Sequence, residues 1–325
     1  DPNHARARQD LSIHHFLNSR WQLGWEAYEA RWLVGDLQPR PFMQKTWNGE
    51  KLKGKRILIW GEQGAGDEIM FVSMLPDLLK EDCEILFETD PRLIPLFERS
   101  LPAIKWLAKS DPPSKEALSK SIDFQCSSGS IGRFLRGSEA KFSGGAAYLK
   151  AERNACDKIR KRYRQNDEKL VGIAWESKSP QSGEDKSMRL VQLKPLFQIE
   201  GIRFIDLQYG DTLEERMTFT NEMGVDLYHD DSIDQLLSLD DFSAQVASLD
   251  LVISVSNTTV HMAGALGVPV WVMLRSIPDR RWMLDREDSP WYSSVRLFRQ
   301  KKMGDWRSVI DKVTSDLKKF EKTSN

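Results

Sequence analysis

Short apolar runs alternate with amphipathic or polar stretches along most of the chain, from Lys55 onward. A first series of candidate strands lies at 56–60, 85–87, 104–107 and 122–124, and a second series lies at 170–175, 203–207, 251–255 and 268–274. Helical patterns follow several of these strands, for example at 68–79. Alternation of strands and helices is typical of parallel sheets covered by helices. The pattern therefore predicts an α/β fold with two Rossmann-like parallel-sheet domains that face each other across a cleft.

The N-terminal residues show helical spacing instead. In the second of two expected helices, Trp25, Tyr28 and Trp32 recur at intervals of three and four residues. A helix of small residues followed by an aromatic helix resembles one unit of a tetratricopeptide (TPR) repeat, which cannot bury its apolar face alone. An ordinary helical hairpin explains the pattern equally well. We expect a TPR-like cap at 1–38, a first sheet domain at 39–165 and a second at 166–305, with further repeats upstream in a longer protein.

Composition and charge exclude several classes of protein. The 325 residues include 47 Lys and Arg against 48 Asp and Glu, so a net charge of −1 gives no electrostatic reason to bind nucleic acid or an anionic membrane. The longest apolar run, 268–274, is far shorter than the ~20 residues that cross a bilayer. The three cysteines are widely spaced and fit neither a disulfide framework nor a zinc site. We therefore expect a cytoplasmic protein without a transmembrane segment.

A glycine-rich loop at 61–67 follows the first strand. It lacks the Gly-Lys-Ser/Thr ending of a P-loop, and Ile69 stands where the dinucleotide motif needs its third glycine, which disfavours a nicotinamide-dependent oxidoreductase. The carboxylates of Glu62, Asp67 and Glu68 would repel a phosphate. A carboxylate held at a helix start suits a general base. On residue type alone, however, helix capping is the more common use of such an aspartate as Asp67.

The loop at 256–261 has the opposite character. It supplies hydroxyls and a helix N-terminus, which together favour a diphosphate, although a polar helix cap explains the same residues. Lys186 and Arg189 offer cations that could stabilise a departing diphosphate, or they are solvated surface charges. His261 alone is more often structural than catalytic. No Asp-x-Asp triplet occurs and histidines are few, so we expect no metal and no cofactor besides a nucleotide-diphosphate sugar as co-substrate.

Six blocks of sequence together carry a resemblance to a known family. They are 60–70 (WGEQGAGDEIM), 90–93 (DPRL), 207–211 (LQYGD), 250–254 (DLVIS), 260–267 (VHMAGALG) and 288–292 (DSPWY). From about Trp21 to Trp306 the chain resembles the glycosyltransferase domain at the C-terminus of many bacterial tetratricopeptide proteins. That domain is similar to the ADP-heptose–lipopolysaccharide heptosyltransferase family, which has the GT-B fold. In such chains a C-terminal helix, here 306–325, returns to the first domain.

The resemblance implies roles for individual residues. Asp67 falls on the Gly-Asp position that supplies the catalytic base, Lys186 falls near the lysine that holds the donor phosphates, and Glu214 matches a carboxylate that binds the nucleotide ribose. The implied donor-binding set is Lys186, Gln208, Glu214, Ser256, Asn257, Thr258, Thr259 and His261, and the implied acceptor-side loop is Glu62, Gln63, Gly64 and Gly66. The family usually has Asp at the position of Ser256 and its relatives usually have Arg at that of Glu176.

These observations lead to one hypothesis and one rival. The hypothesis is a metal-independent, inverting glycosyltransferase that moves a sugar from a nucleotide sugar to a protein or a lipopolysaccharide or other glycan acceptor. Asp67 would take the proton of the attacking acceptor group, and 257–259 with Lys186 would stabilise the departing diphosphate. The rival is a GT-B binding or scaffold module without turnover, which the two departures at Glu176 and Ser256 favour and the intact loop around Asp67 disfavours.

Overall fold

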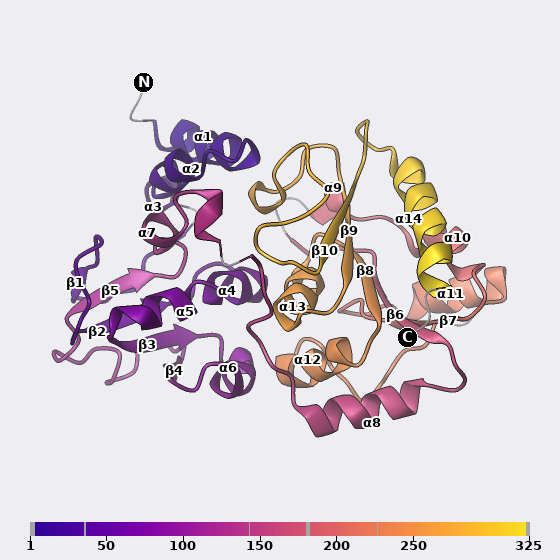
Figure 1. Ribbon diagram of the computed structural model, residues 1–325, viewed down its shortest axis with the longest axis horizontal. Coiled ribbons are helices and arrows are strands. Elements are labelled where there is room, and N and C mark those ends of the chain that lie inside the picture. Colours follow the sequence, from indigo (N-terminus) through magenta and orange to yellow (C-terminus); the bar gives the residue numbers. More distant parts are fainter. Residues whose placement is uncertain (1–3, 36, 143, 180–182, 226, 323–325) are drawn as a thin grey trace. The chain divides into compact units, whose positions relative to one another are not determined.

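The computed structural model describes residues 4–35, 37–142, 144–179, 183–225 and 227–322. The chain divides into two compact units, which we call unit 1 (Asp1–Lys150 and Asp279–Asp285) and unit 2 (Ala151–Pro278 and Arg286–Asn325). Each unit is built on one five-stranded sheet whose neighbouring strands all run parallel (Figure 1). The predicted α/β fold with two parallel sheets is thus confirmed.

The sheet of unit 1 has the strand order β1-β5-β2-β3-β4. Its strands are β1 (Lys45–Thr46), β2 (Arg56–Trp60), β3 (Glu84–Thr89), β4 (Lys105–Ala108) and β5 (Phe124–Ser127). Its helices are α1 (Ala5–Leu17), α2 (Trp21–Tyr28), α3 (Arg31–Val34), α4 (Ala65–Val72), α5 (Leu75–Leu78), α6 (Ile94–Ser100) and α7 (Gly132–Leu135), with short 3₁₀ turns η1 (Leu79–Glu81), η2 (Pro91–Leu93), η3 (Glu139–Lys141) and η5 (Arg280–Trp282). The central β2 is apolar on both faces because helices cover both sides of a parallel sheet.

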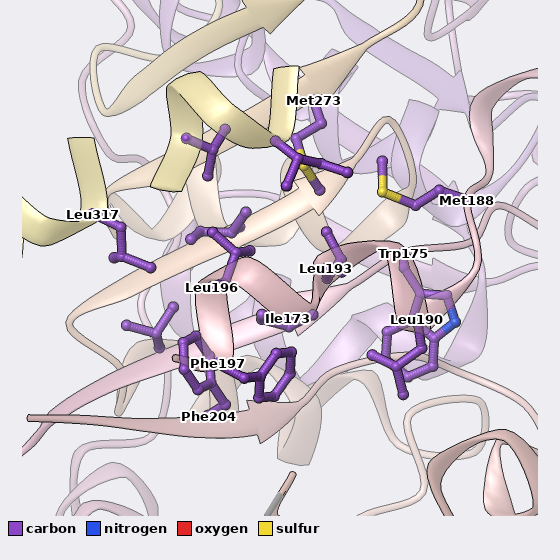
Figure 2. Packing of buried hydrophobic residues seen from close by; sticks show 14 of the residues in the cluster. Ile173, Trp175, Met188, Leu190, Leu193, Leu196, Phe197, Phe204, Met273 and Leu317 are labelled. Atoms are coloured by element: carbon purple, nitrogen blue, oxygen red, sulfur yellow. The ribbon is translucent and has the colours of Figure 1, made fainter. Parts of the chain in front are cut away.

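The sheet of unit 2 has the strand order β10-β9-β8-β6-β7. Its strands are β6 (Lys169–Ala174), β7 (Ile202–Asp206), β8 (Leu251–Val255), β9 (Val270–Leu274) and β10 (Val295–Arg299). Its helices are α8 (Arg153–Tyr163), α9 (Gly183–Lys186), α10 (Lys194–Phe197), α11 (Leu213–Met223), α12 (Leu239–Ala247), α13 (Thr258–Leu266) and α14 (Trp306–Glu321), with the 3₁₀ turn η4 (Leu190–Leu193). Figure 2 shows part of the apolar core, in which Ile173 and Phe204 of the sheet pack with Leu196 and Leu317 of the covering helices.

Several predicted boundaries differ from the structure. The C-terminal helix does not follow the expected return to the first domain, because Val309, Val313 and Leu317 of α14 are buried in the core of unit 2. Unit 2 begins at Ala151 rather than 166, since α8 packs on α12. Segment 279–285, predicted within the second domain, belongs to unit 1. The helix expected at 68–79 is divided into α4 and α5, where a proline stands in the first turn of α5.

The N-terminal segment 1–38 is part of unit 1 rather than a separate cap. Here α1 and α2 pack on each other, with Gly24 directly under the ring of Phe16. Trp25 is 2% exposed and donates a hydrogen bond from its indole to the Arg136 carbonyl at 3.0 Å. The helices of this segment therefore pack on the rest of unit 1, and their relation to TPR repeats stays a prediction.

Candidate active site

A glycine-rich turn joins β2 to α4 and brings two carboxylates to the first turn of that helix. Gly64 is the N-cap residue, and Gln63 before it has a φ of +62°. Asp67 and Glu68 follow in the first turn, where the helix dipole favours negative charge. The turn lies beyond the carboxyl end of a parallel strand, which is where open α/β sheets bind their ligands.

Glu68 points into unit 1. Its side chain is buried, and its carboxylate accepts hydrogen bonds from the Thr89 hydroxyl and, at 3.2 Å, from the Asp90 amide. It lies so close to Gly61 that a Cβ at position 61 would overlap its carboxylate. Burial raises the pKa of the Glu68 carboxyl to about 7. The buried Glu68 carboxylate therefore contacts the chain at the ends of both β2 and β3.

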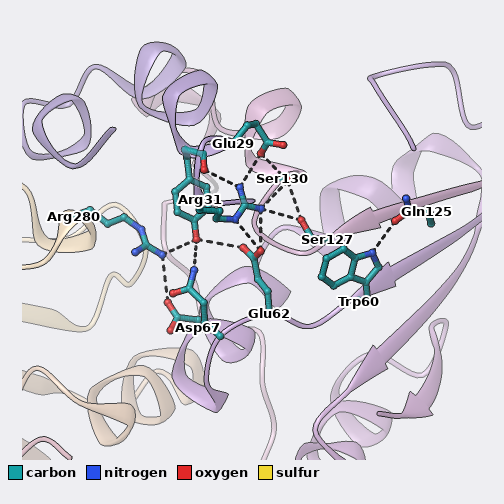
Figure 3. Close-up of polar contacts among 11 residues, drawn as sticks. Glu29, Arg31, Trp60, Glu62, Asp67, Gln125, Ser127, Ser130 and Arg280 are labelled. Atoms are coloured by element: carbon teal, nitrogen blue, oxygen red, sulfur yellow. Dashed lines mark hydrogen bonds and ion pairs between the residues drawn. The ribbon is translucent and has the colours of Figure 1, made fainter. Parts of the chain in front are cut away.

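Asp67 is ion-paired with two arginines of segment 279–285. Its Oδ1 lies 2.6 Å from Arg281 Nη2 and 3.5 Å from Arg280 Nη2, and Figure 3 shows the second of these contacts. Asp67 does not have the helix-capping geometry considered above. Gly64 is the N-cap residue, and the Asp67 carboxylate bonds to arginine instead of a backbone amide. The three side chains are 15% to 18% exposed, so solvent reaches the ion pair.

Tyr28 of α2 connects Arg280 with the glycine-rich turn. The tyrosine hydroxyl accepts hydrogen bonds from Arg280 Nη2 at 3.0 Å and from the Gln63 amide, and it donates to Glu62 Oε1 at 3.3 Å. The Arg280 guanidinium carbon lies 4.7 Å from the centre of the Tyr28 ring, which is a cation–π geometry. The N-terminal helices thus contribute directly to the surroundings of Asp67.

Arg31 of α3 fixes the other end of this network. Its guanidinium is fully buried, and its Nε donates to Glu62 Oε2 at 3.0 Å. It also donates to the hydroxyls of Ser127 at 3.0 Å and Ser130 at 2.8 Å, at the end of β5 and in the following loop (Figure 3). Burial raises the pKa of the Glu62 carboxyl even beside this arginine. Arg31 therefore connects three segments: α3, the glycine-rich turn with Glu62, and the chain at the end of β5.

The predicted acceptor-side residues differ in what they offer a ligand. Glu62 is 3% exposed and its carboxylate is engaged within unit 1, whereas Gln63 and Gly64 are exposed. Gly66 is buried in α4. The sequence analysis did not predict the two arginine partners of Asp67, whose signal is an adjacent arginine pair shortly before the block at 288–292.

In unit 2, the first turn of α13 lies at the carboxyl end of β8. Asn257 is its N-cap residue, and its Oδ1 accepts from the Thr259 amide at 3.0 Å while its Nδ2 donates to the Glu176 carbonyl at 3.1 Å. The Thr259 side chain is fully buried, and its hydroxyl has no hydrogen-bond partner among the described residues. Thr258 is half-buried and Ser256 is buried. Cap and loop therefore join the ends of two neighbouring strands, β6 and β8.

Two of the predicted donor-binding side chains make hydrogen bonds inside unit 2. Gln208 is buried, and its Oε1 accepts from the amides of Trp175 at 3.0 Å and Glu176 at 2.8 Å. His261 is buried, and its Nδ1 lies 2.8 Å from the Tyr292 hydroxyl. Gln208 thus fixes the loops after β6 and β7 to each other, and His261 fixes α13 to the chain before β10.

The remaining donor-binding candidates lie on two helices of unit 2, α11 and α9. Glu214 is exposed on the first turn of α11, and no described residue bonds to its carboxylate. The next residue, Glu215, accepts from the Trp175 indole and the Leu190 amide, both at 2.8 Å. Lys186 is buried at the end of α9, next to Asp185, which pairs with Arg275 at 2.9 Å. Glu214 therefore remains available to a ligand.

Glu176, which stands where related proteins usually have Arg, is half-buried and pairs with Lys178 at 2.6 Å.

Among the described residues, no group of three His, Cys, Asp or Glu side chains is placed to hold a metal ion. Within the same residues, no helix has both the length and the apolar character that a membrane crossing requires.

The sequence is clearly similar to a curated protein. No protein-family model matches the chain. The chain is 32% identical over 318 residues to Protein FlbA of Caulobacter vibrioides, with 91% of this chain and 52% of FlbA covered. The chain thus spans about half the length of this curated relative.

Comparison with solved structures identifies the fold. The chain is similar to a family 9 glycosyltransferase of Veillonella parvula, with a TM-score of 0.58, 15% identity and coverage of 84% of this chain and 92% of that one. It is also similar to the ADP-heptose lipopolysaccharide heptosyltransferase II of Escherichia coli, with a TM-score of 0.58, 11% identity and coverage of 82% and 98%. The chain has the GT-B fold. Another GT-B neighbour is the iron-containing glycosyltransferase TibC of Escherichia coli, with a TM-score of 0.51, 14% identity and coverage of 84% and 76%.

Proposed function

We propose that the chain is an inverting glycosyltransferase that moves a sugar from a nucleotide-diphosphate sugar to a protein or glycan acceptor. The observation that carries this proposal is the carboxyl edge of the second sheet. There the N-cap of α13 bonds to the chain after β6, which leads to Lys186, and Gln208 connects that chain with the one after β7, which leads to Glu214. Helix N-termini favour anions, and a free carboxylate is suited to ribose hydroxyls. The GT-B fold, shared with heptosyltransferases, supports the same reaction class.

In this reaction the donor is held by unit 2. The first-turn amides of α13 that lack partners within the helix, together with the Thr258 hydroxyl and the Lys186 ammonium, would bind the diphosphate. Glu214 would bind the ribose. Gln208, Asn257 and His261 would position these groups through the hydrogen bonds described above rather than touch the donor.

The chemical step would be a direct displacement. The acceptor oxygen or nitrogen forms a bond to the anomeric carbon while the bond from that carbon to the diphosphate breaks. Asp67 takes the acceptor proton, and the diphosphate leaves with its negative charge stabilised by α13 and Lys186. This places the acceptor next to the glycine-rich turn of unit 1.

Calorimetry with ADP, UDP, GDP and CDP tests the donor site. Thr258→Ala and Lys186→Ala should each weaken the binding of the preferred nucleotide by roughly 1–3 kcal/mol, the cost of losing a hydrogen bond to a charged group. The matched controls, Thr220→Ala on α11 and Lys194→Ala on α10, replace exposed residues and should bind as the parent does. Wild-type affinity in both site variants would place the nucleotide elsewhere.

We also propose that transfer needs no divalent metal, since the described residues offer no ligand cluster and the sequence has no Asp-x-Asp triplet. Nucleotide binding and transfer should persist in excess chelator. Complete loss that Mg²⁺ or Mn²⁺ restores would contradict this. Three free cysteines fit a reducing cytoplasm as the compartment.

The rival function is a module that binds a nucleotide sugar without turnover. The ion pair of Asp67 with two arginines favours it, because these contacts occupy the carboxylate that a base must turn toward the acceptor. The two functions separate when donor, acceptor extracts and chain are incubated together. Sugar transfer or slow donor hydrolysis that Asp67→Asn abolishes supports the enzyme, and binding without either reaction supports the module.

A further inference from the structure

Glu176 lies at the junction of the segments that carry the proposed donor groups. Its amide donates to Gln208 Oε1 at 2.8 Å, and its carbonyl accepts from Asn257 Nδ2 at 3.1 Å. Gln208 follows β7, and Asn257 is the N-cap residue of α13. The backbone of Glu176 is therefore fixed between the chain after β7 and the helix N-terminus proposed to bind the diphosphate.

The chain that follows α9 is fixed to the same place. The Met188 amide donates to the Trp175 carbonyl at 3.0 Å, and the Ser177 amide donates to the Ser187 hydroxyl at 2.9 Å. These bonds join the residues on either side of Glu176 to the two residues that follow the end of α9. The side chain of Glu176 therefore starts between the α13 cap and the segment that holds the proposed phosphate-binding lysine.

The carboxylate of Glu176 is only partly used. Its Oε2 lies 2.6 Å from Lys178 Nζ, and no described residue bonds to its Oε1. The side chains of Glu176 and Lys178 are 34% and 51% exposed, so a ligand can reach both. The Lys178 amide donates to the Tyr209 hydroxyl at 2.9 Å, which ties the lysine to the chain after β7.

A carboxylate at this position is unsuited to a phosphate and suited to a sugar. Carboxylates and phosphates both accept hydrogen bonds and both carry negative charge, so they repel each other. Sugar hydroxyls donate, and one carboxylate can accept from two of them. In a nucleotide-diphosphate sugar the sugar is joined directly to the second phosphate, so it lies next to the group that α13 and Lys186 would hold.

We propose that Glu176 determines the sugar specificity of the donor site. Its carboxylate accepts hydrogen bonds from hydroxyls of the donor sugar, and the Lys178 ammonium offsets its charge beside the diphosphate. The ligand class is a neutral, polyhydroxylated sugar, since the same carboxylate repels an acidic one. This inference rests on the proposed function, because it requires a nucleotide sugar in unit 2.

Calorimetry with pairs of ligands tests the inference. The pairs are ADP with ADP-glucose, GDP with GDP-mannose, and UDP with UDP-glucose. Glu176→Gln should bind the sugar conjugate of the preferred nucleotide about tenfold more weakly than wild type does, because hydrogen bonds to a charged group are lost. It should bind the free nucleotide as tightly as wild type or more tightly, because the repulsion of the diphosphate is gone. A residue that only supports the loop would weaken both ligands alike.

UDP-glucuronate tests the selection by charge. Wild type should bind it more weakly than UDP-glucose, and Glu176→Gln should reduce or remove this difference. Lys178→Gln should weaken the binding of nucleotide and conjugate alike, since the carboxylate then acts on the diphosphate without its counter-charge, and Lys178→Arg should restore both. Equal binding of the two UDP-sugars by wild type would contradict the ligand class.

The matched control is Glu287→Gln, which removes a carboxylate that also lies 2.6 Å from a lysine, Lys312 of α14. It should leave both affinities of each pair unchanged. If Glu176→Gln weakens nucleotide and conjugate equally, or leaves the conjugate unchanged, the inference is overturned while the proposed donor site stands. If no nucleotide binds wild type, the proposed function fails together with it.

Discussion

Asp67 and Glu68 are adjacent in sequence and differ in almost everything else. Successive side chains on a helix point about 100° apart, so one faces the arginines and solvent while the other enters the interior. Asp67 pairs with arginines, whereas Glu68 accepts hydrogen bonds from the Thr89 hydroxyl and the Asp90 amide. The same carboxyl chemistry therefore serves ion pairing at one position and strand connection at the next.

Glu68 makes stability depend on pH. Its pKa rises from 4.5 in the unfolded chain to about 7 in the fold, so between these values the folded protein binds more protons and the free energy of unfolding falls as pH increases. The loss should reach about 3 kcal/mol at pH 7 and above, and it should be absent below pH 4.5. Glu68→Gln should remove this slope in denaturant titrations at several pH values.

The control for that series is Glu98→Gln, at an exposed position of α6, which should keep the wild-type slope. An unchanged slope in Glu68→Gln would show that another group is responsible.

Asp67→Asn separates the base from a structural role. Asn keeps the size of the side chain and the partial pairing with arginine, so thermal stability should change little. Transfer should fall by ~10²–10⁴, the usual contribution of general-base catalysis, while nucleotide affinity measured by calorimetry persists. Transfer at the wild-type rate would exclude Asp67 as the base.

The sequence indicated Asp67 because a glycine-rich turn, a strand and a helix start are all local patterns. Its partner Arg281 lies 214 positions away, and no periodicity or propensity connects the two. Tyr28 and Arg31 were missed for a related reason. Their helix spacing predicts only burial, and which polar group meets them is decided by tertiary contacts.

At the scale of elements, α2 and α3 serve as a support for the glycine-rich turn. Arg31 bonds to Glu62 in the turn and to Ser127 and Ser130 after β5, so one side chain connects three segments. Gly129 lies so close to Glu62 that a Cβ there would overlap its carboxylate. The turn is therefore shaped as much by the N-terminal helices as by its own glycines.

Arg31→Met should cost about 3–5 kcal/mol of unfolding free energy, because it leaves the Glu62 carboxylate buried without its partner. The double variant Arg31→Met with Glu62→Leu should be more stable than the sum of the single losses predicts. Chemical denaturation measures all three. Arg56→Met, which breaks a more exposed pair, should cost at most ~1 kcal/mol, and an equal cost at both arginines would contradict a special role for Arg31.

Elements that bury an apolar run were the most predictable. β2 coincides with its predicted range, and β8 does as well, because a run of four or five apolar or small residues between polar turns leaves little choice. β1 was missed because its two residues, Lys45 and Thr46, are both exposed and carry no apolar pattern. β5 begins two residues later than its predicted start at 122, since strand pairing and not hydrophobicity decides where it begins.

At the scale of the molecule, the path of the chain decides which residues surround Asp67. It completes the sheet of unit 1, builds most of unit 2 and then contributes segment 279–285 to unit 1 before β10. Trp282 and Met283 of this segment are fully buried. The surroundings of Asp67 therefore depend on residues encoded near the end of the chain, which a prediction of consecutive domains cannot show.

Trp282→Ala should destabilise the protein by about 3–5 kcal/mol, as expected for removing a buried aromatic side chain. It should also weaken the positioning of the preceding arginines and of Asp67 between them, so sugar transfer measured below the unfolding temperature should fall. Ile277→Ala, at a position that is 59% exposed, is the control and should leave both quantities nearly unchanged. Full stability in Trp282→Ala would indicate that the segment is not anchored by its indole.

The position of segment 279–285 in the sequence also determines when unit 1 can be completed during synthesis. When the ribosome has synthesised Lys150, the 135 residues up to Asp285 are still missing, and at ~5–20 residues per second they take about 7 to 27 s to arrive. During that interval the nascent N-terminal half has its sheet strands and its glycine-rich turn, but Asp67 has neither arginine. Completion of the candidate active site is therefore a late event of biogenesis, and it waits for most of unit 2 to be made.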